Sequence, residues 1–253
     1  MSPIATHSLI ATACDHPAIR LCDLRSGGYS HVLRGHSGRV IAIKWSPTAE
    51  HVFASGGSDG TVRLWDVRKV NSCIAMLDQY NSRPSARPAA PKAHSDTVNG
   101  LAWSSDGLTL VSTGHDNKLR AWDMQAGVNL LINYGTAINN THWQTVTPLI
   151  VDSNLDSAMV FYPSDEGQIL TYGLFTGYLW KRDFCLNGRV TCVIDRPGYA
   201  QVYSGDSAGQ ITRWDAEDVS DPAIHQSTDA GPQGDDILRA ITAEMNSKPV
   251  TFR

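Results

Sequence analysis

Histidine, serine, aspartate and tryptophan recur together in two parts of the sequence. The two sets are His36, Ser55, Asp59 and Trp65, and His94, Ser112, Asp116 and Trp122. Serine, histidine and aspartate could form a hydrolase triad, in which the histidine takes a proton from the serine and the aspartate orients the histidine. A triad occurs once and lies in a pocket, however, whereas this set occurs twice and each copy includes a tryptophan. We therefore interpret both sets as structural networks that satisfy buried polar groups.

Other residues that could support chemistry show no convincing spacing. His31, His51, His115 and His142 are isolated, and the glycine-bearing stretches SGGSDG and GQILTYGLFTG lack the Lys-Ser/Thr pair of a phosphate-binding loop. The five cysteines are scattered without C-x-x-C spacing, so we expect buried thiols in a reducing compartment. We predict that the protein is not an enzyme and uses no cofactor and no metal.

Composition and charge give no general preference for nucleic acid or membrane. The chain has 253 residues, 42% of them hydrophobic, and a formal net charge of −4. The sequence contains no run of eighteen apolar residues and does not start with a basic segment followed by an apolar one. Direct nucleic-acid binding and membrane association are therefore not expected, and protein partners must be inferred from local features.

Internal repeats must position these residues. Four segments end alike: AIRLCD at Asp23, TVRLWD at Asp66, KLRAWD at Asp123 and QITRWD at Asp215, with a weaker copy, GQILTYG, before the last. Short β-rich runs separated by turn clusters surround each segment. Units of about 40 to 45 residues with G-H and W-D signatures are typical of four-stranded β-propeller blades, so the sequence predicts an all-β propeller.

With these motifs the chain resembles the WD-repeat family. The resemblance assigns the two His, Ser, Asp and Trp sets to the polar network within each blade. Other repeats depart from it: Thr12, His16 and Cys22 stand where Ser, Asp and Trp belong in the first, and Asn187, Ala208 and Trp214 stand at the His, Asp and Trp positions of the last. The fourth repeat keeps only the strand pattern, so we expect these blades to depend on packing against their neighbours.

The repeats divide the chain into a partial propeller and a tail. The predicted blades are residues 1–33, 34–78, 92–134, 135–184 and 185–215. Residues 216–253 form an acidic, largely disordered tail with a possible short helix at 235–246, where Ile237, Leu238, Ile241 and Met245 have helical spacing.

The start of the sequence falls inside a repeat. WD-repeat rings of the most similar kind have seven blades, and this chain carries about four and a half. The opening MSP aligns with WSP, a turn within the second repeat. The N-terminal strand that usually completes the last blade is therefore absent, and we expect either a shortened form of a longer protein or a short isoform.

A closer resemblance covers residues 26–135 strongly and residues 136–215 faintly. CDLRSGGYSHVLRGHSGRVIAIKWSP and AHSDTVNGLAWSSDGLTLVSTGHDNKLRAWD are similar to the carboxyl-terminal half of the Cockayne syndrome family of WD-repeat proteins. This resemblance implies a substrate receptor of a cullin-RING ubiquitin ligase that acts in transcription-coupled nucleotide excision repair, and hence a nuclear protein. The implied partners are the ligase's damaged-DNA-binding adaptor and repair and transcription proteins. The alternative is a general scaffold unconnected with ubiquitin ligation.

One motif supports the ligase function separately. Trp65, Asp66 and Arg68 form the W-D-x-R arrangement of WD-repeat proteins that dock on this adaptor, and Asp23 and Arg25 form a partial copy. A planar guanidinium can donate several hydrogen bonds to a partner's carboxylate or carbonyl groups. The alternative is that Arg68 pairs with an acid of a neighbouring blade or with solvent.

A basic insertion separates the second and third repeats. The segment SRPSARPAAPKA carries Arg83, Arg87 and Lys92 among prolines. It could contact phosphate or an acidic protein, or it could be a solvated loop, because three charges without aromatic residues are a weak nucleic-acid signal.

Overall fold

The computed structural model describes most of the repeat region. The described residues are 8–69, 73–82, 91–142, 144–152, 158–185, 188–196, 199 and 201–215. Within these ranges the secondary structure consists of strands and turns, and no helix occurs. Arg83, Arg87, Asn187 and the predicted tail 216–253 lie outside the described residues.

The strands form five antiparallel sheets in which neighbours in sequence are neighbours in space. The first sheet contains β1 (Leu9–Cys14), β2 (His16–Asp23) and β3 (Tyr29–Leu33). The second contains β4 (Val40–Trp45), β5 (Val52–Gly57), β6 (Val62–Asp66) and β7 (Cys73–Met76). The third contains β8 (Val98–Trp103), β9 (Thr109–Gly114), β10 (Lys118–Asp123) and β11 (Val128–Asn129). The fourth contains β12 (Leu149–Val151), β13 (Met159–Ser164), β14 (Gln168–Gly173) and β15 (Leu179–Phe184), and the fifth contains β16 (Val190–Asp195), β17 (Gln201–Asp206) and β18 (Ile211–Asp215).

Turn chemistry explains the sharp reversal between the second and third strands of a blade. In four sheets this turn contains one residue with positive φ: Gly60, Asn117, Gly167 and Gly209. Glycine and asparagine adopt this conformation most readily. At Gly60 a side chain is also excluded by space, because a Cβ atom there would lie 2.6 Å from the carbonyl oxygen of His94 in the next blade.

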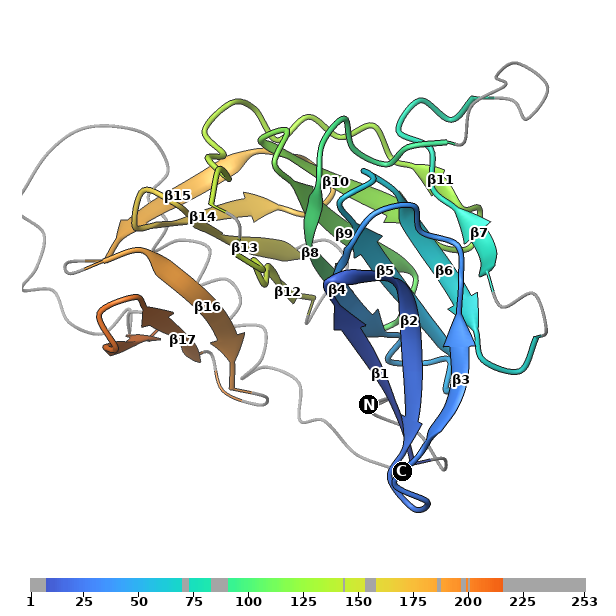
Figure 1. Cartoon of the computed structure of the whole chain (residues 1–253). Helices are drawn as coiled ribbons and strands as arrows, with labels where there is room; N and C mark the ends of the chain where they lie inside the picture. Colours follow the sequence, from blue (N-terminus) through green and yellow to red (C-terminus); the bar gives the residue numbers. More distant parts are fainter. Residues whose placement is uncertain are drawn as a thin grey trace, which may run out of the picture.

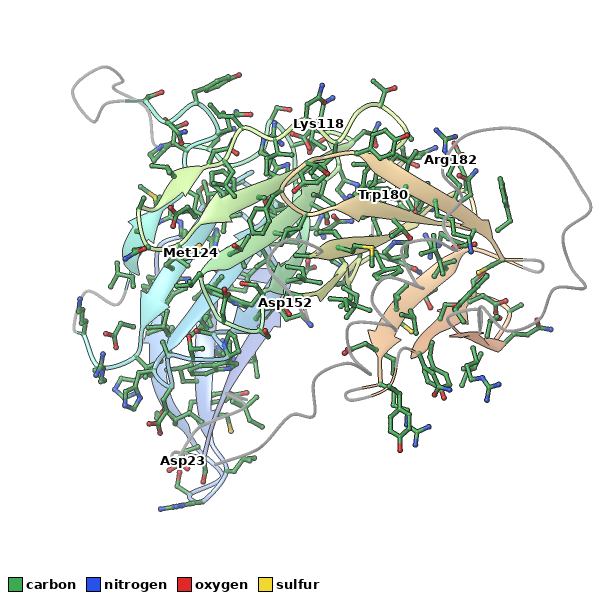
Figure 2. The ribbon with its side chains drawn as sticks, turned by 180° about the vertical axis from the view of Figure 1, so that it is seen from behind. Asp23, Lys118, Met124, Asp152, Trp180 and Arg182 are labelled. Carbon is green, nitrogen blue, oxygen red and sulfur yellow. The ribbon has the colours of Figure 1, made fainter. Side chains whose placement is uncertain are left out.

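The five sheets follow one another along an arc (Figure 1). The first and fifth sheets stand at its two ends in both overall views (Figures 1 and 2). Strands β4, β8, β12 and β16 are the first strands of successive sheets, and they contact one another in that order. They therefore form the inner side of the arc, as the first strands of propeller blades do.

The hydrophobic core lies between sheets rather than within one layer. Ile19 and Leu21 of the first sheet pack with Phe53 and Trp65 of the second. Equivalent clusters join the second sheet to the third, the third to the fourth, and the fourth to the fifth. Trp65 is fully buried in this packing. Each blade is thus stabilised by its neighbours, as expected for a repeat architecture.

The prediction of an all-β propeller that is not complete is confirmed for the described residues. β2 ends at Asp23 as β6 ends at Asp66, so the first sheet has no counterpart of β4 within the described part. In the fifth sheet β18 occupies the third position, and the described residues provide no fourth strand beside it.

The prediction of buried cysteines is wrong. Cys14 and Cys192 are exposed, and Cys22, Cys73 and Cys185 are partly exposed. Cys14 ends β1 at a tight turn, and Cys192 lies on β16 at a position whose side chain faces away from the core. Apolar residue type alone did not reveal which face of the strand these thiols occupy.

Candidate functional site

The second blade brings His36, Ser55, Asp59 and Trp65 together at one end of its sheet. The indole Nε1 of Trp65 donates to Ser55 Oγ at 2.7 Å, and Ser55 Oγ lies 2.6 Å from His36 Nε2. His36 Nδ1 lies 3.1 Å from each carboxylate oxygen of Asp59. Asp59 also accepts hydrogen bonds from the backbone N–H groups of Ser37 and Thr61.

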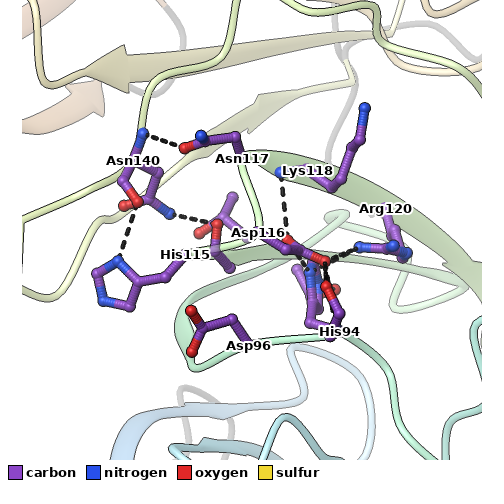
Figure 3. Close-up of polar contacts among 12 residues, drawn as sticks. His94, Asp96, His115, Asp116, Asn117, Lys118, Arg120 and Asn140 are labelled. Atoms are coloured by element: carbon purple, nitrogen blue, oxygen red, sulfur yellow. Dashed lines mark hydrogen bonds and ion pairs between the residues drawn. The ribbon is translucent and has the colours of Figure 1, made fainter.

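The third blade repeats this chain of contacts with His94, Ser112, Asp116 and Trp122. Trp122 Nε1 donates to Ser112 Oγ at 2.8 Å, His94 Nε2 lies 2.7 Å from the same oxygen, and His94 Nδ1 lies 2.8 Å from Asp116. Figure 3 shows that Arg120 approaches Asp116 beside His94, and its guanidinium donates to the carboxylate at 2.9 Å.

The contacts indicate where the protons lie in the second-blade network. The tryptophan N–H can only donate, and the aspartate can only accept. In the second blade Ser55 therefore accepts from Trp65, and with a neutral ring His36 Nδ1–H donates to Asp59 while Nε2 accepts from Ser55. In the third blade His94 Nδ1 faces both an acceptor, Asp116, and a donor, Arg120 Nη1 at 2.7 Å, so the same contacts do not assign its proton. Burial lowers the pKa of His94, which agrees with a neutral ring. Burial acts to raise the pKa of Asp59, but hydrogen bonds and charge from His36 lower it by more. The pKa of Asp59 is therefore well below its usual value, and the carboxylate is ionised.

This arrangement leaves the serine without catalytic freedom. The hydroxyls of Ser55 and Ser112 are buried, and each is held between an indole and an imidazole. No substrate atom can reach them without displacing the core tryptophan. In both blades the serine hydroxyl thus joins the core tryptophan to the histidine and satisfies buried polar groups of each.

The remaining blades replace parts of the network. Trp214 Nε1 donates to Ser204 Oγ at 2.8 Å in the fifth blade, whereas Ala208 occupies the aspartate position in its turn. In the fourth blade, Asp165 accepts hydrogen bonds from the backbone N–H groups of Thr141 and His142. The fourth repeat thus keeps an acidic turn that the sequence pattern did not reveal.

In the first blade the substituted residues do not form a network. Thr12 Oγ1 donates to the carbonyl oxygen of Arg20, and His16 Nδ1 accepts from the N–H of Ala18. Cys22 is partly exposed on β2.

The turns that follow the third strands lie at the opposite end of the sheets from the histidines. In four sheets the first residue of this turn donates its backbone N–H to a carbonyl oxygen just before the second strand of the blade. Val67 donates to His51 in this way, and Met124 donates to Leu108. We call this end of the blades the basal face. It carries Asp23 and Arg25 of the first blade and Asp66 and Arg68 of the second.

Asp66 and Arg68 form a bidentate ion pair on the basal face. Arg68 Nε and Nη2 donate to the two carboxylate oxygens of Asp66 at 3.0 and 2.9 Å, and the backbone N–H of Arg68 donates to Asp66 Oδ1 at 3.0 Å. The hydrogen bond from Arg68 is the main reason that the pKa of Asp66 is lowered to about 2. The Asp66 side chain is 5% exposed, whereas that of Arg68 is 63% exposed.

Asp23 and Arg25 share the turn but not the ion pair. The backbone N–H of Arg25 donates to Asp23 Oδ1 at 3.0 Å, as in the second blade. The guanidinium instead donates from Nε to Ser8 Oγ at 3.2 Å. Asp23 lies at the tip of its sheet (Figure 2). The two W-D-x-R candidates therefore present their guanidinium groups differently.

A pocket of about 560 Å³ opens near the basal ends of the inner strands. Its walls include Trp45 at the end of β4, Trp103 at the end of β8, and Asp152 just after β12. Arg196 and Tyr199 close it from the fifth sheet, and the Arg196 guanidinium lies 3.9 Å from the centre of the Tyr199 ring. No sequence motif predicted this pocket, since its residues come from four different repeats.

A second group that sequence analysis missed is a pair of buried asparagines. Asn99 and Asn140 exchange two side-chain hydrogen bonds of 2.8 Å each. Asn140 also donates to the carbonyl oxygen of Gly114, and its backbone N–H donates to Asn117 Oδ1 (Figure 3). These contacts fix the connection between the third and fourth blades near the His94 network.

The other sequence candidates have little structural support. Lys92 is exposed, and its carbonyl oxygen accepts a hydrogen bond from Gln79. Among the described residues, no three His, Cys, Asp or Glu side chains are grouped as metal ligands. A search of the same part of the chain for a helix with the length and hydropathy needed to cross a membrane found none.

Comparisons with known proteins agree with the repeat pattern. Residues 27–66 and 89–123 match the family described as WD domain, G-beta repeat. The chain is 27% identical to the WD repeat-containing protein ATCSA-1 of Arabidopsis thaliana over 85% of this chain and 61% of that protein. It is 29% identical to the WD repeat-containing protein slp1 of Schizosaccharomyces pombe over 54% of this chain and 25% of that protein.

A solved structure supports the fold. A chain in the crystal structure of the mitotic checkpoint complex matches 83% of this chain and 58% of its own length, with a TM-score of 0.64 and 23% sequence identity. The chain thus spans about 61% or less of the two relatives described above. Together the matches place WD repeats in residues 27–66 and 89–123 and agree with a β-propeller fold.

Proposed function

We propose that this WD-repeat protein is a substrate receptor of a cullin-RING ubiquitin ligase and docks on the ligase's damaged-DNA-binding adaptor through Arg68. The resemblance to the Cockayne syndrome family extends the proposal to transcription-coupled nucleotide excision repair in the nucleus. Repair and transcription proteins would then be its other partners. The proposal treats the propeller as a binding scaffold without catalysis of its own.

The observation that carries the proposal is the orientation of Arg68 by Asp66. Two of the guanidinium nitrogens bond to the nearly buried carboxylate, and Nη1 is not used in this pair. The arginine is therefore held in one orientation while much of it faces solvent. A fixed, exposed cation loses less conformational freedom on binding than a mobile one, which favours its use as an interface residue.

Arg25 supports the same interface less strongly. Among the described residues its guanidinium donates one hydrogen bond, to the hydroxyl of Ser8, whereas Arg68 makes a bidentate ion pair. Exposed Leu24 lies next to it on the basal face and could add apolar contact area. We expect Arg25 to contribute less to adaptor binding than Arg68.

A general scaffold function is the second candidate. The chain also matches proteins named for other processes, including anaphase-promoting complex subunit cdc20 of Dictyostelium discoideum, at 32% identity over 46% of this chain, and a ribosome biogenesis protein WDR12 homologue of Chlamydomonas reinhardtii, at 31% over 48%. A WD-repeat surface can thus serve other partners.

Binding of the purified full chain to the purified adaptor tests the proposal. Arg68→Ala should reduce affinity by at least about tenfold without loss of folded structure, as expected for an interface hot spot. Lys69→Ala is the matched control, because it removes the adjacent positive charge but leaves the ion pair of Arg68 with Asp66 and the backbone hydrogen bond from Lys69 to the Asp66 carbonyl oxygen in place. Equal binding by folded Arg68→Ala protein would reject the docking site, and no binding by the wild-type chain would favour the general scaffold.

A further inference from the structure

The basal pocket combines apolar walls with an exposed apolar rim. Trp45 and Phe161 are nearly buried at its base, whereas Ile194 is 59% exposed and Tyr199 is 55% exposed. Large apolar side chains with this exposure are typical of a surface that binds another segment. The volume of about 560 Å³ lies in the range of pockets that hold a ligand or a few side chains.

The lining of the pocket also carries charged side chains. Lys44 lines the pocket. The Lys44 side chain is exposed at this end of β4. A segment that brings a carboxylate close to Lys44 would form an ion pair with its ammonium group. Two acids also line the pocket, Asp152, which accepts the backbone N–H of Ser105, and Asp195, and Arg196 adds a second cation.

The described chain ends beside this pocket. Asp215, the last residue of β18, pairs with Gln201 on β17, and Gln201 lines the pocket. Residues 216–253 therefore begin at its rim. They carry seven acidic and three basic residues, which gives this segment a net charge equal to the −4 of the whole chain.

We propose that residues 235–246 of this carboxyl-terminal segment occupy the basal pocket of their own chain. Ile237, Leu238 and Ile241 supply the apolar side chains, and Asp235 or Asp236 lies opposite Lys44. The proposal concerns the chain's own intramolecular contact and is independent of adaptor docking.

The connection between Asp215 and the docking segment is long enough. About 20 residues separate them, and a flexible chain of this length has a root-mean-square span of roughly 25 Å. The pocket begins at the residue paired with Asp215, so the linker needs to cross only a short distance. Tethering at such a length gives an effective concentration on the order of millimolar, so weak contacts are sufficient. A partner's segment would lack this advantage.

Photo-crosslinking in the full chain tests the proposal. Benzoylphenylalanine in place of Leu238 should crosslink to residues 193–202 and 147–152 of the same molecule, as mapped by mass spectrometry. The matched control carries the same photo-residue in place of Val250, beyond the docking segment, and should give at least fivefold less crosslinking to these regions. Ile194→Glu, a change at an exposed rim position, should reduce the Leu238 crosslink by a similar factor.

Mixing chains labelled with ¹⁴N and ¹⁵N identifies the occupant. Crosslinked pairs of a single isotope support the intramolecular contact. Mixed-isotope pairs would mean that a second copy occupies the pocket. Crosslinks outside the pocket, or pocket crosslinks that Ile194→Glu does not reduce, would mean that the pocket is free for a separate partner. Either result overturns the proposal, whatever the outcome of the adaptor experiment.

Discussion

Asp66 holds Arg68 through three hydrogen bonds to one carboxylate, two from the guanidinium and one from the backbone N–H. The aspartate ends β6, and the arginine lies two residues later in the turn. This spacing lets the same carboxylate close the turn and orient the side chain. Asp23 makes only the backbone contact with Arg25, so sequence similarity between the two turns does not imply the same presentation of the arginine.

The ion pair makes stability depend on pH in a defined range. The pKa of Asp66 is lowered to about 2 from 3.8, chiefly by Arg68. A lowered carboxylate pKa stabilises the folded state above pH 3.8, and this contribution is lost as pH falls towards 2. As pH falls from 3.8 to 2, wild type should therefore lose about 1 kcal/mol more of its free energy of unfolding than Asp66→Asn does. The expected difference is small because solvent screens the exposed Arg68. Urea unfolding at several pH values measures this, and parallel pH profiles would contradict it.

The His36 network should contribute to stability and not to partner binding. Asp59→Ala removes the acceptor of His36 and of the backbone N–H groups of Ser37 and Thr61. Each buried group left without a partner costs about 1–3 kcal/mol, so the melting temperature of the full chain should fall. Affinity for the adaptor, measured on the remaining folded protein, should not change. A stable variant that lost one specific interaction would show that Asp59 acts in binding.

The propeller and its networks could be predicted because their signals are local and repeated. Each W-D segment ends a strand, and each histidine lies a similar distance before its serine, so two copies confirm one another. The exposure of Arg68 was less predictable. Its type suggested contact with a partner, but the carboxylate that orients it is Asp66, two residues earlier. The acid that pairs with Arg68 thus belongs to its own turn and not to a neighbouring blade, while much of the side chain remains exposed.

Features built from several blades gave no sequence signal. Asn99 and Asn140 are 41 positions apart and meet only because the third blade passes its chain to the fourth. The basal pocket similarly combines Trp45, Trp103 and Tyr199 from three repeats. Such contacts depend on how the sheets pack around the arc, which periodicity along the chain does not specify.

The hydroxyl of Ser112 should be coupled to the indole of Trp122. Ser112→Ala removes the acceptor of Trp122 Nε1 and the hydrogen-bond partner of His94 Nε2, so it should cost about 1–3 kcal/mol. In a Trp122→Phe background the same substitution should cost less, by about 1 kcal/mol, because one orphaned group is already gone. Ser95→Ala is the control, since its exposed hydroxyl makes only a 3.4 Å contact with Asp116. Additive free energies of unfolding would rule out the coupling.

Three buried tyrosines of one core cluster provide a matched test of hydrogen-bond satisfaction. Tyr134 Oη donates to the carbonyl oxygen of Leu174 at 2.5 Å, whereas the hydroxyls of Tyr162 and Tyr172 are buried with no hydrogen-bond partner among the described residues. Tyr134→Phe should therefore destabilise the protein by about 1 kcal/mol, because it leaves a carbonyl without its donor. Tyr162→Phe and Tyr172→Phe remove the same atom but relieve a desolvation cost, so each should leave the free energy of unfolding unchanged or raise it by about 1 kcal/mol. Urea denaturation of the three variants compares them directly. A loss at Tyr172 as large as that at Tyr134 would mean that its hydroxyl is satisfied in solution, for example by an internal water molecule.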